Sequence, residues 1–559
     1  MENKIYGIDL GTTYSAIAFV NDATKAEIIP NSDNERVTPS VVFFESASKV
    51  IVGKEARETA KTDPDKVVAL IKREMGTDMT KEFDGKSFTP EEISSFILKR
   101  LVDDAKTTGD HDVKDVVITC PAYFGAAERN ATENAGKLAG LNVIQILDEP
   151  IAAAISYVMD RLEQDNTVIV YDLGGGTFDA TVVKVGKGNV EVVCTDGDHQ
   201  LGGADWDQRL INYFISEFQS QTGGGEDIVD DAETMFDLRL LAENAKKHLT
   251  KKESTVVRVT YGGEKVNIEV TRDKFNELTQ DLLQRTIEFT NNVLEIAKGK
   301  GITKIDDFLL VGGSTRMCQV PEAVKSNFSE RLGVEPKSFE VDEAVAKGAA
   351  LFGFIKYVQQ KINDAIKEIN ETNQGSDDSQ EPDNRTEEQK EQDKQEAINK
   401  VLDEIGLAPE KKEIVNVDIK TVATRSYGLR VLQKGNPVVF NMIMKQTQVP
   451  ASFEREFPVT ESNAEKLVLT VFSNNDSEKI VQLDDSVEVG NATMMLTEGL
   501  PAGSPIRVKF CLDKDGSLKM EALDVTNNKS IDANFDVKDG LSQEEIEKKR
   551  AENADISVE

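Results

Sequence analysis

Two glycine-containing loops of the sequence carry the residue types that bind phosphates. The first reads Asp9-Leu10-Gly11-Thr12-Thr13-Tyr14, and the second reads Asp172-Leu173-Gly174-Gly175-Gly176-Thr177-Phe178-Asp179. Glycine lets the backbone approach a phosphate closely, while exposed N–H groups and threonine hydroxyls can hold its oxygens. Aspartates at the strand ends suit a hydrated Mg²⁺ beside those phosphates. Either loop alone also fits an ordinary turn, but two such loops in one chain favour a phosphate site.

Three further segments could complete a nucleotide site. Gly312-Gly313-Ser314-Thr315-Arg316 follows an apolar strand, so its glycines can lie against a sugar or base while Arg316 stacks on the base. Gly202-Gly203 is another loop that allows close approach. Glu243, Lys246 and Lys247 fall at helical spacing and could reach a ribose or base. The same spacing also fits a solvated helix face.

Alternating strand and helix patterns must position these loops. The predicted strands are residues 5–10, 15–20, 116–119, 167–172 and 308–311. The predicted helices, whose apolar residues recur every three or four positions, are residues 90–105, 126–140, 149–160, 204–219, 233–249 and 271–298. This alternation predicts an α/β domain with helices covering sheets. The pattern of the first loop returns about 160 residues later, which predicts a duplicated domain with a cleft between its halves.

The remainder of the chain has a different texture. Residues 370–396 hold no aliphatic or aromatic residue and are rich in acids and amides, which predicts a disordered acidic linker. Residues 395–405 regain helical spacing before Gly406. Short β-rich runs separated by turn residues then predict an antiparallel β-sandwich. The last predicted element is a charged helix that begins at Ser542. The expected divisions are residues 1–357, 358–412, 413–540 and 541–559.

Composition excludes several classes of function. Among 559 residues, 66 Lys and Arg against 100 Asp and Glu give a net charge of −34, which argues against binding nucleic acid or anionic membranes. Four cysteines without a C-x-x-C motif and three histidines argue against a zinc or multi-histidine site. The sequence shows no signal-peptide pattern and no apolar run of about 18 residues. We therefore expect a cytoplasmic protein.

The motifs together resemble the nucleotide domain of DnaK-type chaperones, the heat shock protein 70 family. Besides the loops above, the resemblance rests on Pro121-Ala122-Tyr123-Phe124, Glu149-Pro150, Leu201-Gly202-Gly203-Ala204-Asp205 and Asp342-Glu343-Ala344-Val345-Ala346. It implies an α/β actin-like ATPase domain, duplicated into two lobes around a nucleotide cleft, followed by the sandwich. The β-rich region resembles the family's substrate-binding sandwich more weakly, through Ser426-Tyr427-Gly428 and Val449-Pro450.

The resemblance implies ATP or ADP, Mg²⁺ and K⁺ as cofactors. Catalytic roles fall on Lys72, Glu149, Asp172 and Thr177. Metal positioning falls on Asp9, Asp172 and Asp179. Nucleotide contacts fall on Gly11, Thr12, Thr13, Tyr14, Gly174, Gly175, Gly176, Gly202, Gly203, Glu243, Lys246, Lys247, Thr250, Gly312, Gly313, Ser314, Arg316 and Asp342.

The implied function is that of an ATP-dependent chaperone, which hydrolyses ATP slowly and uses the nucleotide state to control binding of unfolded or extended polypeptides. A J-domain co-chaperone and a nucleotide exchange factor are the implied further partners. By alignment, the peptide pocket would be lined by Leu429, Leu432, Phe457, Leu467 and Leu469. An alternative for these five residues is that they form the core of the sandwich.

The chain departs from the family pattern at several positions. Gln145 replaces a basic residue at the surface expected to contact J-domains and the interdomain linker. The short leucine-rich linker is missing, and residues 413–419 are its candidate substitute. The helical lid that covers bound peptide is missing too, with only residues 542–553 as its stub. The acidic insert and the altered linker favour one alternative, a nucleotide-gated regulatory protein with one dedicated partner and negligible hydrolysis. A small-molecule kinase of the same superfamily is a second alternative, against which the attached sandwich and the lack of a sugar-pocket motif count.

Overall fold

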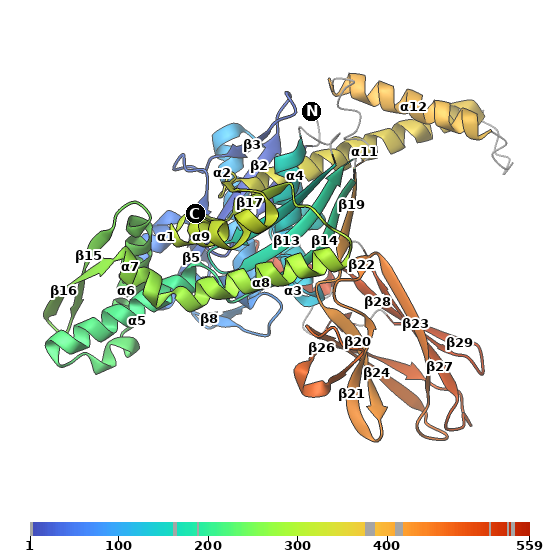
Figure 1. Cartoon of the computed structure of the whole chain (residues 1–559). Helices are drawn as coiled ribbons and strands as arrows, with labels where there is room; N and C mark the ends of the chain where they lie inside the picture. The colour runs from blue at the N-terminus through green and yellow to red at the C-terminus, as the bar shows by residue number, and fades with distance from the viewer. Residues whose placement is uncertain are drawn as a thin grey trace.

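The computed structural model describes residues 4–159, 165–186, 189–374, 386–407, 417–513, 516–533, 536–537 and 543–559. It contains a two-lobed α/β domain, a β-sandwich beside it, and a helical hairpin that projects from the α/β domain (Figure 1). The actin-like domain followed by an antiparallel sandwich agrees with the predicted fold class. Within the described ranges, no helix is both long enough and apolar enough to cross a bilayer.

The first lobe, residues 4–148, is a mixed sheet covered on one face by two helices. Its elements are β1 (Ile5–Asp9), β2 (Tyr14–Val20), β3 (Ala26–Ile29), β4 (Thr38–Pro39), β10 (Asp115–Cys120), β11 (Asn142–Asp148), α2 (Pro90–Gly109) and α3 (Ala126–Leu138). The strand order is β11-β10-β1-β2-β3, with β4 paired to β2. β1 runs parallel to β10, so the loop after β1 lies at the same edge of the sheet as the end of β10.

A second, smaller sheet belongs to the first lobe. Its elements, with the helix and hairpin around it, are α1 (Lys54–Thr59), β5 (Val41–Ser46), β6 (Lys49–Val52), β7 (Val67–Ala69), β8 (Lys81–Phe83), β9 (Lys86–Phe88) and β31 (Ser557–Val558). The sheet order is β31-β6-β5-β7, and β8 pairs with β9 alone. The last strand of the chain therefore completes a sheet that begins about 500 residues earlier.

The second lobe, residues 166–338, repeats the plan of the first. Its large sheet has the order β18-β17-β12-β13-β14-β19-β22. Those strands are β12 (Asn166–Leu173), β13 (Phe178–Gly186), β14 (Asn189–Asp198), β17 (Asp307–Val311), β18 (Pro336–Ser338), β19 (Asp418–Val422) and β22 (Gln448–Val449). The helices and the outer hairpin are α5 (Gly203–Thr222), α6 (Ala232–Leu249), α7 (Arg272–Leu278), α8 (Gln280–Gly299), α9 (Gln319–Val324), α10 (Glu330–Leu332), β15 (Ser254–Tyr261) and β16 (Glu264–Thr271).

The sequence repeat corresponds to a structural repeat. β1 and β2 flank the first glycine loop, and β12 and β13 flank the second, each as an antiparallel pair. Two helices, α4 (Glu149–Val158) and α11 (Ala344–Gln374), pack together between the lobes. A Cβ atom on Gly348 would lie 1.7 Å from the carbonyl oxygen of Ala152, so glycine is required for this close helix contact. The contact fixes the two loops relative to each other.

One predicted helix, residues 271–298, is wrong in its continuity. The structure has two helices there, α7 and α8, which meet at Thr279. The Thr279 side chain is fully buried, and its hydroxyl donates to the carbonyl oxygen of Phe275 at 2.8 Å. The backbone of Thr279 leaves the helical region at φ −119°. Helical periodicity continues across the break because both helices face the same core.

The predicted disordered linker, residues 370–396, is also wrong in large part. α11 continues to Gln374, and α12 (Glu387–Glu404) begins at a capping box between Thr386 and Gln389. Residues 375–385 lie outside the described residues. Ala397, Ile398, Val401 and Leu402 of α12 bury their side chains in the core shared with α11. Residues 387–396 of α12 are mostly Glu, Gln and Lys, which favour helix. The buried end at residues 397–402 anchors α12, so the polar half remains helical without apolar contacts of its own.

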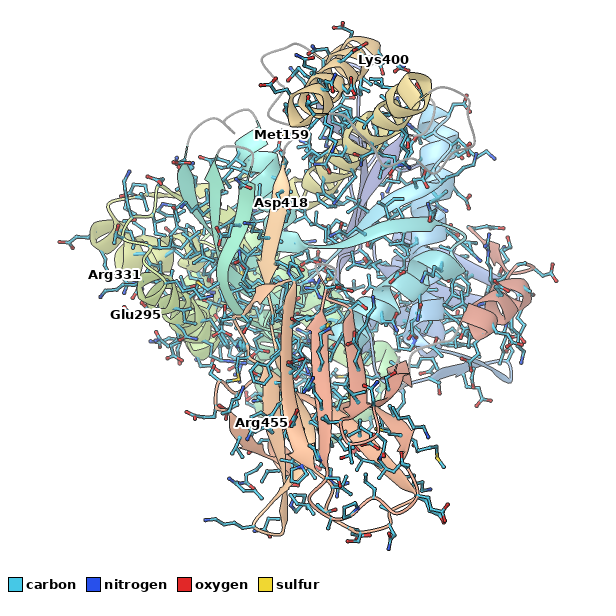
Figure 2. All side chains as sticks on the ribbon, turned by 90° about the vertical axis from the view of Figure 1, so that its right-hand side faces the viewer. Met159, Glu295, Arg331, Lys400, Asp418 and Arg455 are labelled. Carbon is cyan, nitrogen blue, oxygen red and sulfur yellow. The ribbon has the colours of Figure 1, made fainter. Side chains whose placement is uncertain are left out.

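The chain then enters the second lobe before it reaches the sandwich. β19 pairs in parallel with β14, and Gln359 of α11 donates to the carbonyl oxygen of Val417 at 3.0 Å. Figure 2 shows Asp418 at the start of this strand, below the hairpin that carries Lys400. The described part of the candidate linker, residues 417–419, is thus a buried residue followed by a strand. Residues 413–416 lie outside the described residues.

The sandwich consists of two antiparallel sheets. The first has the order β25-β21-β20-β24-β26-β30, and the second has the order β23-β27-β28-β29. The strands are β20 (Ser426–Gln433), β21 (Asn436–Ile443), β23 (Ala451–Pro458), β24 (Lys466–Asn474), β25 (Ile480–Gln482), β26 (Val487–Met495), β27 (Pro505–Leu512), β28 (Leu518–Asp524), β29 (Lys529–Ala533) and β30 (Asp536–Val537). The predicted final helix is α13 (Gln543–Glu552), and Ser542 lies outside the described residues.

Candidate nucleotide site

A buried lysine and three carboxylates meet between the two lobes. Lys72 lies on a 3₁₀ turn, Ile71–Glu74, and its ammonium group forms an ion pair with Glu149 at the first position of α4. Asp9 ends β1 and accepts a hydrogen bond from the Thr119 hydroxyl at 3.3 Å. Asp172 near the end of β12 completes the group. The elements of both lobes thus bring together three of the residues predicted to act on phosphate.

The charges of this group are unbalanced. Burial, together with the charge of Glu149, raises the pKa of Asp9 to about 7, and Lys72 offsets only part of the effect. Burial and the neighbouring Glu149 and Asp9 likewise raise the pKa of Asp172 well above its usual value. Burial disfavours the charged form of Lys72, but Glu149 and Asp9 outweigh it and raise the pKa of the lysine. The cluster holds more negative charge than one lysine neutralises, which suits a bound cation.

The two predicted phosphate loops touch each other. A Cβ atom on Gly175 would lie 2.1 Å from the Thr13 hydroxyl, and one on Gly176 would lie 2.4 Å from the Thr12 methyl group. The second loop therefore depends on glycine for its contact with the first. Gly11 and Gly174 occupy the turns beside them. Thr177 is buried at the start of β13, as expected for a residue that faces the junction of the loops.

The predicted loops of the second lobe form one hydrogen-bonded unit. Gly203 and Ala204 donate their amides to the carbonyl oxygens of Gly174 and Gly175 at 3.0 and 2.8 Å. The Ser314 hydroxyl donates to the same Gly174 oxygen at 2.8 Å. Gly202 and Gly203 open α5, and Gly312 and Gly313 open a single 3₁₀ turn. The unit presents glycine backbone from three segments toward one place.

The predicted adenosine residues of α6 contact Tyr14 of the first lobe and the start of α5. Glu243 pairs with Lys247 at 2.6 Å and accepts a hydrogen bond from the Tyr14 hydroxyl at 3.3 Å. Lys246 donates to Asp207 at 2.7 Å and to the carbonyl oxygen of Gly203 at 2.8 Å. Only 11% of the Lys246 side chain is exposed, so the solvated helix face does not describe this residue.

The remaining adenosine candidates lie beside that helix. Thr250 follows α6, and its hydroxyl donates to the carbonyl oxygen of Lys247 at 2.7 Å. Arg316 holds Asp342 through two hydrogen bonds of 2.7 and 2.5 Å. A guanidinium held flat in this way keeps one face free to stack on a ring.

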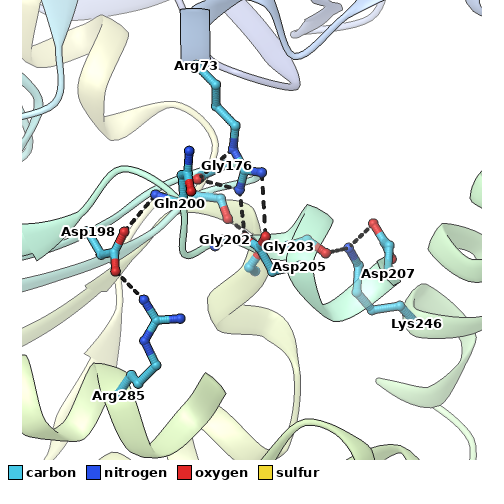
Figure 3. Close-up of polar contacts among 12 residues, drawn as sticks. Arg73, Gly176, Asp198, Gln200, Gly202, Gly203, Asp205, Asp207, Lys246 and Arg285 are labelled. Atoms are coloured by element: carbon cyan, nitrogen blue, oxygen red, sulfur yellow. Dashed lines mark hydrogen bonds and ion pairs between the residues drawn. The ribbon is translucent and has the colours of Figure 1, made fainter. Parts of the chain in front are cut away.

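Sequence reasoning missed two arginines that connect the lobes. Arg57 of α1 forms an ion pair with Glu243 and donates to the Tyr14 hydroxyl at 2.6 Å. Arg73, beside Lys72, donates to Asp205 at 2.6 Å and to the carbonyl oxygen of Gly176 at 2.7 Å (Figure 3). The position of Arg73 next to a predicted catalytic lysine was the one signal in the sequence. Arg57 carries no local signal, because its partner lies 186 positions away.

Asp205 and Asp198 were missed as well. Asp205 accepts the amide of Gly202 at 2.8 Å, so it supports the Gly202-Gly203 loop as well as Arg73. Asp198 accepts the amide of Gln200 at 2.8 Å and pairs with Arg285 of α8. Figure 3 shows these carboxylates on either side of the loop that leads into α5. Their hydrogen bonds to the amides of Gln200 and Gly202 fix the shape of this loop.

Asp179 is one of the three aspartates predicted to position a metal ion. The Oδ2 atom of Asp179 accepts the Ala122 amide at 3.3 Å, whereas its Oδ1 atom is buried without a hydrogen-bond partner. Burial and the charge of Glu149 raise the pKa of Asp179 well above its usual value. In the described part of the chain, no three acidic, histidine or cysteine side chains are close enough to hold a metal directly. The set therefore fits a cation whose other ligands are phosphates and waters.

The predicted peptide residues are divided between the core and the surface of the sandwich. Leu429 and Leu469 are 2% and 5% exposed within the core, which agrees with the alternative assignment for these two. Phe457 and Leu467 are partly buried at its margin. Leu432, near the end of β20, is 56% exposed.

Two similar lobes, a phosphate-loop pair and a buried lysine–carboxylate group between them define an actin-like nucleotide-binding protein. The family model described as Hsp70 protein matches residues 5–370 and 406–559. The chain therefore belongs to the Hsp70 family, a family of ATP-dependent chaperones.

Curated relatives agree with this assignment. The proteins named "Chaperone protein DnaK" of Thermotoga petrophila and Thermotoga maritima are each 43% identical over 355 residues, covering 62% of this chain and 58% of theirs. The protein of the same name from Thermosipho melanesiensis is 34% identical over 552 residues, covering 97% of this chain and 82% of its own. The chain thus matches a little over half the length of the two Thermotoga relatives.

Proposed function

We propose that the chain is an ATPase chaperone in which the nucleotide state controls binding of unfolded or extended polypeptides by the sandwich. One observation carries the proposal. β19, which leads into the sandwich, is hydrogen-bonded to β14 in the same sheet whose β12–β13 turn forms the second phosphate loop. A change in that loop can reach the sandwich through two intervening strands. A nucleotide must favour one interdomain arrangement over another for such coupling to exist.

The residues of the site divide the work of hydrolysis. Bound ATP and Mg²⁺, with K⁺ nearby, would supply the phosphoryl group and the charge that offsets it. Lys72 and Glu149 hold each other in place and are positioned to orient a water or the terminal phosphate. Thr12, Thr13, Gly175 and Thr177 hold phosphate oxygens. Asp9, Asp172 and Asp179 set the position of the cations.

The adenosine end of the nucleotide would lie between the lobes. Glu243, Lys246 and Lys247 face it from α6, with Thr250 following that helix. Gly313, Ser314, Arg316 and Asp342 face it from the opposite segments. Because Arg57 bridges to Glu243 across the cleft, nucleotide entry and release require this contact to open. An exchange factor that separates the lobes would act on the same contact.

The remaining parts of the proposal follow from the same arrangement. We assign residues 1–357 to the ATPase domain and residues 413–540 to the sandwich, in the cytoplasm. A J-domain partner would meet the surface around Gln145, which is half-buried on β11. Because a basic residue is missing there, we expect stimulation by a generic J-domain to be weak.

Single-turnover ATP hydrolysis by the full chain, with and without an unfolded peptide, tests the proposal. Lys72→Ala should slow hydrolysis at least about a hundredfold while nucleotide binding persists, since the lysine acts mainly in the transition state. Lys66→Ala, an exposed lysine on a neighbouring turn, is the matched control and should change the rate less than about twofold. Hydrolysis that peptide does not accelerate would favour the dedicated-partner alternative.

A further inference from the structure

The last segment of the chain, residues 543–559, packs on the first lobe of the ATPase domain. α13 lies against α3, and β31 lies beside β6. In Figure 2 the final helix, in the faint red of the chain end, lies apart from the sandwich and against the blue first lobe. This position differs from the expected one for a lid remnant, which would cover the sandwich. We call residues 543–559 the clasp.

The clasp adds a strand to the small sheet of the first lobe. Ser557 and Val558 are in parallel register with Lys49 and Val50. The amide of Val52 donates to the carbonyl oxygen of Glu559 at 2.7 Å, and the amide of Glu559 donates to the carbonyl oxygen of Val50 at 3.0 Å. Without the clasp, β6 would be the edge strand of this sheet. An exposed edge strand has unpaired backbone groups to which another strand can bind.

One side chain of the clasp, that of Asn553, is buried and hydrogen-bonded to polar residues of the first lobe. Asn553 is 1% exposed. Its amide nitrogen donates to Glu92 at 3.0 Å, and its amide oxygen accepts from Lys86 at 3.0 Å. Lys99 donates to the backbone carbonyl oxygen of the same residue at 3.3 Å. A buried amide with every group satisfied gives specificity, because another side chain would leave these partners unpaired.

The partners of Asn553 are themselves fixed. Glu92 is 2% exposed, accepts the backbone amide of Thr89 at 3.0 Å as part of the α2 capping box, and pairs with Lys549 at 2.7 Å. Ile546 and Ile556 of the clasp are 4% and 7% exposed, and Ile556 joins the core of the first lobe. The site therefore binds the side chains of Lys549, Asn553 and Ile556 at fixed positions along one segment.

The clasp is connected to the sandwich by a short stretch of chain. β30 ends at Val537 and pairs with β26, and α13 begins at Gln543. Six residue steps span at most about 20 Å even when fully extended. While the clasp is bound, the sandwich cannot move farther than this from the first lobe.

We propose that the first lobe carries a binding site for one extended segment, that residues 543–559 occupy it, and that this clasp keeps the sandwich at the first lobe. The sandwich then has two attachments, with β19 in the second lobe and the clasp in the first. Its direct contacts with the first lobe include the pair of Arg425 with Glu128 at 3.0 Å, a hydrogen bond from the Thr424 hydroxyl to the carbonyl oxygen of Phe124 at 3.4 Å, and Ala126 packed against the sandwich core. The clasp adds a covalent tether to these contacts, because it continues the same chain. The inference goes beyond the proposed function, because it requires neither hydrolysis nor peptide binding.

Hydrogen exchange of the full chain tests the clasp without reference to activity. Asn553→Ala should speed amide exchange at residues 49–52 about tenfold or more, because Glu92 and Lys86 lose a buried partner. Exchange at residues 423–425, which lie against Phe124 and Glu128 of the first lobe, should rise with it. Lys548→Ala is the matched control, since this lysine is 74% exposed and one position from Lys549. It should leave both segments unchanged.

Two results would overturn the proposal. Unchanged exchange at residues 49–52 in Asn553→Ala and in a second variant, Ile556→Asp, would mean that the segment is not held at this site. Faster exchange at residues 49–52 with unchanged exchange at residues 423–425 would mean that the clasp binds but does not keep the sandwich in place. Protection in the buried helix α11 reports whether each variant is folded.

Discussion

Both lobes of the ATPase domain take up a strand from a segment that flanks the sandwich, but they do so in different sheets. In the second lobe, β19 extends the large sheet that contains β12 and β13, which form the triple-glycine loop. In the first lobe, β31 extends the small sheet β6-β5-β7, which contains neither β1 nor the loop after it. We therefore expect the pairing of β19 with the second lobe to change with the bound nucleotide. The pairing of β31 with the first lobe should stay the same.

The largest expected effect comes from weakening the attachment at the second lobe. Lys445 of the sandwich pairs with Asp196 on β14 at 2.9 Å, with 17% and 11% of their side chains exposed. Lys445→Ala removes the ion-pair partner of Asp196, which keeps its hydrogen bond from Asn292, at a cost of about 2 kcal/mol to docking. Exchange at residues 418–422 should rise, and stimulation of hydrolysis by peptide should fall, while exchange at residues 49–52 stays unchanged. The matched control is Lys466→Ala on the exposed face of β24.

A smaller effect should follow from the helical hairpin. Val401 of α12 is 1% exposed in the core shared with α11, and α11 holds Val417 just before β19. Val401→Ala removes buried methyl groups and should destabilise the hairpin by about 1–2 kcal/mol. Exchange at residues 417–420 should rise, with no change at residues 49–52. An equal rise in both segments would show that the two attachments do not act separately.

The smallest effect concerns pH and the attachment at the first lobe. Burial alone would raise the pKa of Glu92, but hydrogen bonds from Lys549, the Thr89 backbone and Asn553 outweigh it and lower the pKa. Because folding lowers the pKa of Glu92, its carboxylate stabilises the bound clasp fully above the usual pKa, about 4.3. This stabilisation is lost as the pH falls through the lowered pKa. Acid should therefore lower the protection of residues 49–52, measured as the exchange rate relative to the intrinsic rate at the same pH. Glu92→Gln should weaken the clasp at neutral pH and remove that part of the acid dependence.

The sequence was sufficient for those parts of the site that lie within single motifs. The two phosphate loops were predicted from a local pattern of strand end, carboxylate and glycine, whereas Lys72 and Glu149 were predicted only from the resemblance to the family. Arg57 and the clasp were not found, because their partners lie far along the chain and only the fold brings them together. The helical part of residues 370–396 was missed for a different reason. Its helix depends on an apolar end at residues 397–402, outside the polar tract.

Hydrogen exchange of the full chain with Mg²⁺ and ATP, compared with Mg²⁺ and ADP, tests the central claim most directly. We predict that exchange at residues 418–422 differs several-fold between the two nucleotides, because β19 shares a sheet with a phosphate loop. Exchange at residues 49–52, which the clasp protects, should be the same in both. A nucleotide-dependent change at residues 49–52 as large as that at residues 418–422 would contradict the account.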